Sequence, residues 1–511
     1  MFKKILPYLF FTLISLIYVM TFRGVLGNPT EIDLQKNNWK EAGPLELSPE
    51  RGRYALLYSI VEHKSFKFTE SIGNFAAPDV GVLKGKYVSL FAPLLSFTLI
   101  PGYVLGKVIG LSQVGTFFTI SVFAILNAFF IGKIAVRLGA GKIASCIAAL
   151  AFVFGTPAFS YGVSLYQHHL STLFILLALY ALFRFRSWIA GIVVSFLFAA
   201  SIPLDYPNLF FFFPVFIYSV IRMFGLERIK SVVRVKFRFL SLLSIVSFAL
   251  PVLFFLWFNN SSYGNPFQLS GTLPTKAVQV VKDTSSTQDK SLLLDSKGNN
   301  ITKKEAVTFF KTRNIINGLY IHSISPDRGV IFYAPIVLFG IFGAIYLWSK
   351  KQKELVLLIS IICANVVLYS MWGDPWGGWA FGSRYLIPSY AILSILVAFA
   401  FKKFNKNAWF YIAFFLVGVY SIAVNTLGAI TTNANPPQVE VLALEKLSGV
   451  QERYMFDRNY FYLLNTGSKS FTYNNVFKNI LTPVQYYVLL VITLTATLNI
   501  LMVSHLLKKH D

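Results

Sequence analysis

The sequence is short of charge, acid and cysteine. Of 511 residues, 13% are charged, two are cysteine and 22 are acidic, against 46 lysines and arginines. With a hydrophobic content of 55% and a mean hydropathy of +0.60, this composition excludes an ordinary soluble domain and predicts a polytopic membrane protein. Cys146 and Cys363 both lie inside apolar runs, so the sequence indicates neither a disulfide framework nor a thiolate metal site.

Recognisable metal-binding patterns are also missing. The neighbouring histidines His168 and His169 come without the further ligands at defined spacing, such as an HxxxH or DxD pattern, that a metal site requires. The sequence therefore indicates no metal site and no cofactor, and it leaves dependence on a divalent metal open.

The formal charge of +24 is distributed in short clusters between apolar runs. The clusters are RLGAGK (137–142), RFR (184–186), the stretch from Arg222 to Arg238, SKKQK (349–353) and KKFNK (402–406). Such clusters are typical of cytoplasmic loops, because lysine and arginine are enriched on that side of a membrane. The charge therefore indicates membrane topology and gives no reason to expect a nucleic-acid partner.

The apolar runs predict about twelve membrane-spanning helices. They cover about 5–22, 113–136, 143–160, 170–183, 188–204, 208–224, 239–258, 329–348, 354–371, 385–401, 408–427 and 484–507. The run 87–110 is predicted to be interfacial or re-entrant, because counting it as a span would place all five basic clusters outside. The first run is predicted to be a retained signal anchor, and the protein to lie in the cytoplasmic membrane with both termini inside.

This topology places the polar segments on the outer face. They are 23–110, with a predicted amphipathic helix at 53–63 on the membrane surface, and the segments 166–169, 204–208, 259–328, 371–388 and 428–483. Within 259–328, the polar stretch 281–305 predicts a mobile loop. We expect a transmembrane domain over 1–427 and, over 428–511, an outer loop followed by one further helix.

The stretch 371–388, MWGDPWGGWAFGSRYLIP, combines groups that suit a ligand. Arg384 offers a planar guanidinium for a phosphate or carboxylate, and Asp374 is the acid of the stretch. Trp376 and Trp379 have rings that can stack on a sugar or a polyprenyl unit. The structural alternative is a belt of interfacial tryptophans beside an arginine that reaches the headgroups.

Two acids of the first outer segment are candidate general bases. Asp79 and Glu50 are each predicted to lie beside an apolar wall, where a raised pKa would suit the deprotonation of a hydroxyl. The alternative is that they are ordinary solvated loop acids. Arg53 and Lys86 are candidate cationic contacts for the substrate in the same segment.

Four further polar residues lie where predicted spans meet the outer face. His168 or His169 is a candidate for phosphate binding or proton relay, and the alternative is a helix cap. Asp205 is a candidate sugar contact or a cap of the next helix. Arg328 either binds anionic headgroups or joins Arg384 in a bidentate grip on one phosphate.

The order of these segments resembles that of a known family. The similar motifs are SPERGRYALLYSIVE, DVGVLKGKYVSLFAP, LYQHH, DYPN, NNSSYGNPF, SPDRGVIFYAP and WGGWAFGSRYLIP. They resemble a prokaryotic branch of the polytopic glycosyltransferases of the protein O-mannosyltransferase and aminoarabinose-transferase type, which have the GT-C fold. The resemblance extends over about residues 1–400.

This resemblance implies a GT-C-like all-α membrane enzyme that moves a sugar from a polyprenyl-phosphate donor to a glycan, lipid or protein acceptor on the outer face, with inversion. In the family the base is an acid of the first outer segment, often one of a pair, whereas SPERGRY has Glu50 alone. Two alternatives remain. One is a transporter or flippase of lipid-linked sugars, and the other is a non-catalytic relative.

Overall fold

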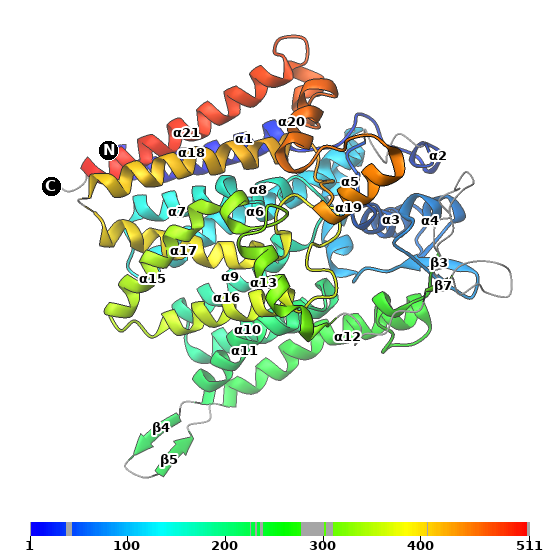
Figure 1. Ribbon diagram of the computed structural model, residues 1–511. Coiled ribbons are helices and arrows are strands. Elements are labelled where there is room, and N and C mark those ends of the chain that lie inside the picture. The colour runs from blue at the N-terminus through cyan, green and yellow to red at the C-terminus, as the bar shows by residue number, and fades with distance from the viewer. Residues whose placement is uncertain are drawn as a thin grey trace.

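The structure of the protein is a computed structural model. It describes residues 2–36, 43–224, 226–229, 232–235, 239–276, 301–302, 310–405 and 407–507. Most of the predicted mobile loop 281–305 and the basic end Lys508–Lys509 lie outside the described residues. The molecule is a bundle of long helices that run in roughly one direction, with shorter elements gathered at one end (Figure 1).

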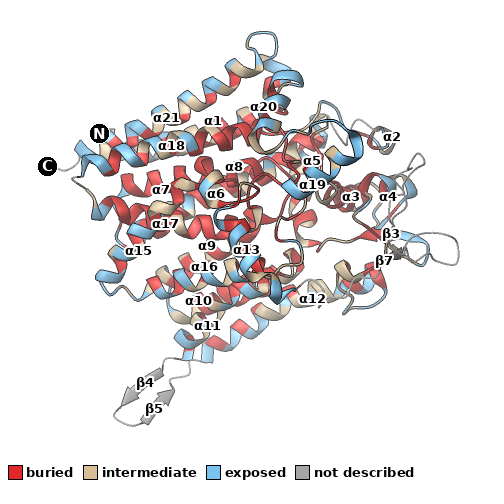
Figure 2. Ribbon diagram, viewed as in Figure 1, coloured by how far each residue is buried: buried red, intermediate tan, exposed pale blue. Residues whose placement is uncertain are grey.

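Six of the described helices are long and apolar enough to cross a membrane. They are α6 (Ser112–Arg137), α10 (Ser187–Leu204), α12 (Leu243–Tyr263, preceded by the 3-10 turn Phe239–Leu242), α17 (Ile387–Lys403, preceded by Arg384–Leu386), α18 (Ala408–Ile430) and α21 (Pro483–Leu507). Their apolar faces remain partly exposed along α12 and α21, as expected where helices face lipid (Figure 2).

Shorter apolar helices complete the bundle. They are α1 (Phe2–Thr21), α7 (Lys142–Gly155), α9 (His168–Arg184), α11 (Asn208–Phe224), α15 (Gly340–Ser349, preceded by Pro335–Phe339), α16 (Glu354–Ser370) and α5 (Leu94–Val108). With α5 set aside, the long and short helices correspond in order to the predicted spans. The prediction of an all-α polytopic membrane protein is confirmed.

The basic clusters gather at one end of the bundle. Four hydrogen bonds join neighbouring loops there, from Arg137 to the carbonyl of Phe183, from Arg222 to Phe185, from Lys402 to Gly139 and from Gln352 to Leu138. The start of α1 and the end of α21 lie at this end (Figure 1). We call it the terminal end and its opposite the loop end. If the run 87–110 does not cross the membrane, the basic clusters and the two ends of the helix bundle's chain are predicted to lie on the same side. The structure has this arrangement.

Helix α5 packs at the loop end against α6 and against α3 (Ser48–Glu62). Gly102 of α5 and Gly115 of α6 let the two backbones touch, because a methyl group on either would overlap the carbonyl of the other. The hydroxyl of Ser96 donates to the carbonyl of Arg53 over 2.9 Å. Helix α5 is therefore part of the support for α3, in agreement with its prediction as an interfacial helix.

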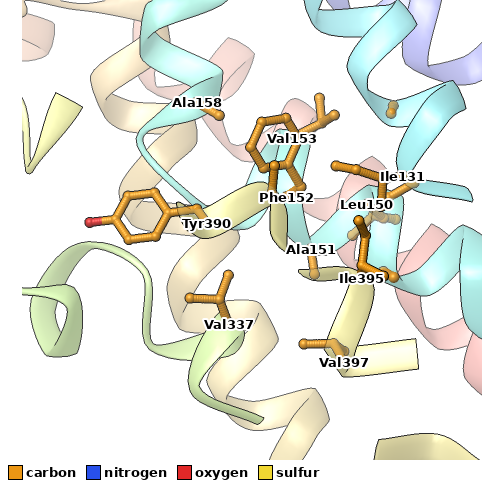
Figure 3. Close-up of a cluster of buried hydrophobic side chains, with 14 of the residues drawn as sticks. Ile131, Leu150, Ala151, Phe152, Val153, Ala158, Val337, Tyr390, Ile395 and Val397 are labelled. Atoms are coloured by element: carbon orange, nitrogen blue, oxygen red, sulfur yellow. The ribbon is translucent and has the colours of Figure 1, made fainter. Parts of the chain in front are cut away.

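The core of the bundle lies around α7. Every residue from Ile143 to Gly155 is buried, which requires neighbours on all sides of this alanine-rich helix. Figure 3 shows Phe152 and Val153 of α7 among side chains of α6, α17 and the turn before α15, represented by Ile131, Ile395 and Val337. This core fixes the helices whose ends carry the polar groups described below.

A small sheet at the loop end was not predicted. Its strands are β1 (Lys67–Phe68), β2 (Val80–Leu83), β3 (Lys86–Ser89), β6 (Thr275–Lys276) and β7 (Ile301–Thr302), in the order β1-β3-β2-β6-β7. The strand pair β2–β6 is antiparallel and joins Gly81 to Thr275, so the first outer segment is tied to the loop after α12. Strands of two to four residues leave little periodicity for sequence-based prediction.

The predicted surface helix 53–63 differs from the observed α3. Helix α3 begins earlier, at Ser48, and its residues from Glu50 to Ser59 are all buried. It is covered by α5, β3 and α4 (Glu70–Ala76). The charges in its first turns have partners, since Arg51 donates to the carbonyls of Glu46, Phe75 and Ala77. The helix is thus a buried element of the loop end and does not present an open apolar face to lipid.

The remaining elements are short connections. At the loop end they are α2 (Glu31–Leu34), α8 (Ala158–Tyr161), Ser270–Thr272, Thr312–Asn314, α13 (Ile315–Ser323), α14 (Val330–Tyr333), α19 (Gln438–Ser448), α20 (Met455–Asn465) and the π-helical turn Tyr473–Phe477. The hairpin of β4 (Leu226–Ile229) and β5 (Val232–Val235) lies between α11 and α12 in the chain and projects away from the bundle (Figure 1).

Candidate functional site

Three segments far apart in the sequence meet through one polar chain at the loop end. Arg53 of α3 donates from Nη2 to Oε1 of Gln167 over 2.6 Å, and Nε2 of Gln167 donates to Oδ2 of Asp205 over 2.7 Å. Gln167 precedes α9, and Asp205 follows α10. The ends of these helices therefore bring a guanidinium and a carboxylate into one site.

Arg384 belongs to the same site. Its Cζ lies 4.7 Å from the ring centre of Tyr166, and Cζ of Arg53 lies 5.4 Å from that ring. Both guanidinium groups thus make cation–π contacts with one tyrosine, which is a neutral partner and cancels no charge. The ring of Tyr166 also stacks on His168, with 5.8 Å between centres and 11° between planes.

The hydrogen bonds of Arg384 leave part of its guanidinium unused. Nη2 donates to the carbonyl of Gly377 over 2.7 Å, and the guanidinium also interacts with the ring and the hydroxyl of Tyr385. Nε and Nη1 are buried and have no hydrogen-bond partner among the described residues. Because buried donors are almost always paired, these two atoms are candidate contacts for a ligand.

The carboxyl groups near the two arginines do not balance their charge easily. Burial raises the pKa of Asp205, although Gln167 and the two arginines oppose the effect. Burial likewise raises the pKa of Glu50. Burial also lowers the pKa of Arg53 to about 10, which leaves it charged at neutral pH. The site therefore favours an anionic ligand, because its cations stay charged while the ionised forms of its acids are penalised.

The two candidate bases lie near the start of α3. Oε1 of Glu50 accepts a hydrogen bond of 3.1 Å from the amide of Leu165, so this buried carboxyl links α3 to the segment before α9. Asp79 is half-buried, and its Oδ2 accepts a bond of 2.6 Å from the hydroxyl of Ser48. Asp79 is thus the more open of the two acids, and Glu50 is the more enclosed.

Arg328 lies 1% exposed and uses its donors on the backbone. It donates to the carbonyls of Trp376, Asp327, Gly378 and Asn435, over 2.7 to 3.0 Å. These bonds hold the stretch 371–388, which we call the tryptophan-rich loop, against the segment after α18. Unlike Arg384, Arg328 offers little free capacity for a phosphate, so the two arginines do not form the bidentate pair that the sequence suggested.

The tryptophans and the acid of this loop have partners within the protein. Nε1 of Trp376 donates to Asp327 over 3.0 Å, and Nε1 of Trp379 donates to Glu440 of α19. Oδ2 of Asp374 accepts a bond of 2.6 Å from the amide of Gly378. Both indoles and Asp374 therefore shape the loop, whatever further contact they make with a ligand.

The two histidines differ in their surroundings. His169 is fully buried, with one ring nitrogen 2.7 Å from the carbonyl of Ala158 and the other 3.1 Å from the amide nitrogen of Asn127. His168 stacks on Tyr166 at the site, and its Nε2 is buried without a hydrogen-bond partner among the described residues. His168 therefore keeps an unpaired ring nitrogen beside Tyr166, whereas both ring nitrogens of His169 are used to link helices.

Lys86 lies apart from the buried site. It is exposed on β3, beside the turn of the β2–β3 hairpin, where Leu83 and Lys86 are paired across the strands. No contact in the described part of the chain joins it to Arg53 or Arg384.

Sequence reasoning missed several polar groups. Gln167, which links Arg53 to Asp205, and Tyr166, which contacts both arginines, occur in the motif LYQHH but were not recognised as links. Glu46 is buried and forms ion pairs with Lys469 and Arg23, the latter over 3.9 Å. Its Oε2 also accepts bonds from Thr432 and from the amide of Asn433. The sequence LELSPE (45–50) contains the one available signal for this residue, because it places Glu46 only four residues before the candidate base Glu50.

The segment after α18 is thereby joined to the site. Lys469 and Asn433 contact Glu46, and Tyr454 donates to Asp327 over 2.6 Å. These contacts connect residues 428–483 to α3 and to the tryptophan-rich loop. Among the described residues, no group of three or more His, Cys, Asp or Glu side chains could hold a metal ion.

The searches of protein families and of curated proteins found no match. Among solved structures, the chain is similar to the crystal structure of ArnT from Cupriavidus metallidurans in the apo state. The two share 10% sequence identity with a TM-score of 0.43, over 98% of this chain and 76% of the other.

Proposed function

We propose that the protein is a membrane glycosyltransferase that moves a sugar from a polyprenyl-phosphate donor to an acceptor on the outer face of the cytoplasmic membrane. The observation that carries the proposal is the buried pair of unpartnered donors on Arg384, next to a second guanidinium on Arg53. A phosphate supplies the negative charge and the acceptor oxygens that this site lacks. The motif resemblance supplies the reaction class.

In the proposed reaction, the acceptor hydroxyl oxygen attacks the anomeric carbon of the donor sugar. The bond between that carbon and the phosphate oxygen breaks, and the polyprenyl phosphate leaves with the electron pair. Arg384 and Arg53 stabilise the charge that develops on the leaving phosphate, so this oxygen needs no proton. The proton of the acceptor hydroxyl passes to a carboxylate, and attack opposite the leaving group inverts the anomeric carbon.

We assign the role of base to Asp79. It is half-buried and thus open to an incoming acceptor, and it is held by one hydrogen bond from Ser48. Glu50 is fully buried and bonded to the amide of Leu165, which suits a supporting role. His168, Trp376 and Trp379 are proposed to line the path of the sugar or the lipid, and the acceptor class is left open.

The test is a transfer assay with the full chain in lipid nanodiscs and a panel of radiolabelled polyprenyl-phosphate sugars. We expect release of polyprenyl phosphate together with transfer to an acceptor fraction from the cell envelope. Asp79→Asn should lower the rate by about 10²–10⁴-fold, and Glu50→Gln should lower it less.

Two outcomes would contradict the proposal. Proteoliposomes that move the lipid-linked sugar across the bilayer without transferring it would identify a transporter. Binding of the donor with no turnover, unchanged by Asp79→Asn and Glu50→Gln, would identify a non-catalytic relative.

A further inference from the structure

The turn Trp376–Gly378 binds two arginines through three consecutive carbonyls. Arg328 donates to the carbonyls of Trp376 and Gly378, each over 2.8 Å. Arg384 donates to the carbonyl between them, that of Gly377, over 2.7 Å. Three successive peptide carbonyls are therefore each satisfied by a guanidinium, and the outer two belong to a different arginine from the middle one.

The backbone of this turn is set by its glycines. Gly377 and Gly378 both have positive φ, +73° and +62°, a conformation that costs an L-residue about 1–2 kcal/mol. The turn is closed from within, because Asp374 accepts bonds from the amide of Gly378 through its side chain and from the amide of Gly377 through its carbonyl. The conformation is thus fixed before any ligand arrives.

The turn is also fixed from outside. Arg328 carries a third bond to the carbonyl of Asn435, and Asp327 accepts bonds from Trp376 and from Tyr454. The segment after α18 therefore holds the turn through the pair Asp327–Arg328. Movement of the carbonyl of Gly377 would require several of these linked hydrogen bonds to break together.

We propose that the turn Trp376–Gly378 is a positioning device for Arg384. Arg328 holds the two outer carbonyls, so that the middle carbonyl grips Nη2 of Arg384 and leaves Nε and Nη1 directed at the ligand. The proposal rests on the proposed function in that the ligand is the phosphate end of the lipid donor. Gly377, Arg328 and Asp374 are accordingly positioning residues, and Arg384 is the residue that touches the phosphate.

The chain offers a matched pair of variants, because Gly377 and Gly378 have similar positive φ but different surroundings. A Cβ on Gly377 would lie 3.1 Å from Cε2 of Tyr385 and 3.3 Å from Nε of Arg384. A Cβ on Gly378 would have Oδ2 of Asp374 as its nearest neighbour, at 3.9 Å. Gly377→Ala therefore displaces Arg384, and Gly378→Ala imposes a similar backbone strain without touching it.

The experiment measures binding of farnesyl phosphate and of farnesol to the full chain in nanodiscs. We expect the wild type to prefer the phosphate, Arg384→Gln to lose that preference, and Gly377→Ala to reduce it about tenfold. Gly378→Ala should keep it within about threefold. Farnesol serves as the control for general damage, because a protein that is merely destabilised would lose affinity for both compounds alike.

A second readout requires no ligand. The rate at which phenylglyoxal modifies Arg384, followed by mass spectrometry, should rise in Gly377→Ala because Nη2 loses its carbonyl, and should match the wild type in Gly378→Ala. Equal effects of the two alanine variants in both readouts would overturn the positioning device and leave the proposed function standing. The opposite outcome is also possible to distinguish. If the wild type shows no preference for the phosphate, but the modification rate of Arg384 changes only in Gly377→Ala, the proposed ligand is overturned and the positioning device is supported.

Discussion

Arg328 and Arg384 bind the same short turn, yet their surroundings differ. Arg328 lies among carbonyls and donates to four of them, so its hydrogen-bonding capacity is nearly used within the protein. Arg384 donates to one carbonyl and otherwise lies among aromatic rings, with two buried donors unpartnered in the described structure. A buried guanidinium whose partners are all internal stabilises the fold, whereas one with spare donors is suited to a ligand.

The same contrast separates two glutamates four residues apart, Glu46 before α3 and Glu50 in its first turn. Glu46 lies between Lys469 and Arg23, and their attraction lowers its pKa even though burial alone would raise it. Glu50 has no such ion pair in the described chain, and burial raises its pKa. The loop end thus contains an ion-paired cluster around Glu46, in which Nε and Nη1 of Arg23 also lack a hydrogen-bond partner among the described residues. Beside it lies an open cluster, around Glu50, Arg53 and Arg384, that has no ion pair in the described chain and includes residues proposed for the reaction.

The largest effect is expected where the open cluster is broken. Arg384→Gln should lower sugar transfer by about 10²–10³-fold, because the leaving phosphate loses a buried charged donor. The melting temperature should fall only modestly, because Arg384 contributes to the fold one hydrogen bond to a carbonyl and contacts with the rings of Tyr166 and Tyr385. Transfer assays and thermal unfolding of the same preparation measure the two quantities, and a large loss of stability with unchanged turnover would reverse the assignment.

Arg328→Met should show the opposite pattern, with its main effect on the stability of the fold. Removing this guanidinium leaves the partly buried carbonyls of Trp376 and Gly378 without their donor, and that of Asn435 with only the amide of Ala380, at a cost on the order of 2–3 kcal/mol of unfolding free energy. Thermal unfolding in detergent should show a marked decrease in melting temperature. Hydrogen exchange of peptides covering 372–386 should rise in Arg328→Met and change little in Arg384→Gln.

Substituting Glu50 and substituting Glu46 should change the stability of the fold in opposite directions above about pH 4. The raised pKa of Glu50 means that its ionised form destabilises the fold, so this cost appears as pH rises above the unfolded value of about 4.3. Glu50→Gln should therefore gain stability relative to the wild type between about pH 4 and 7. The lowered pKa of Glu46 stabilises the fold above that value, so Glu46→Gln should lose stability over the same interval. Melting curves at several pH values decide the matter, and parallel curves for both variants would contradict the distinction.

The smallest effect is expected at the edge of the loop. Trp376→Phe keeps an aromatic ring but loses the hydrogen bond to Asp327, which is worth about 1 kcal/mol of stability. Transfer should fall by only a few fold, because Arg328 still holds the carbonyl of residue 376. Lys86→Ala is the control, since this exposed residue should leave both stability and transfer unchanged.

Much of the architecture could be predicted because its causes are local in the sequence. Apolar runs of sufficient length specified the helices, and the basic clusters specified which loops share an end. The short strands of the loop-end sheet and the burial of α3 could not be predicted, because they depend on contacts between segments such as Gly81 and Thr275.

For the site, the residue types were informative but their partners were not. The sequence identified Arg53, Asp205 and Arg384 as candidates, and it did not show that Gln167 and Tyr166 join them. It also grouped Arg328 with Arg384, because an arginine before a predicted span looks the same whether it binds carbonyls or a ligand. The distinction depends on hydrogen bonds across 48 to 107 residues of chain.

The most direct test of the account is a cryo-electron microscopy structure of the full chain in nanodiscs with a polyprenyl phosphate. We expect the phosphate within hydrogen-bonding distance of Nε and Nη1 of Arg384, with the carbonyl of Gly377 still bound to Nη2 and Arg328 still bound to its carbonyls. A phosphate bound elsewhere, with Nε and Nη1 of Arg384 still unpartnered, would contradict it.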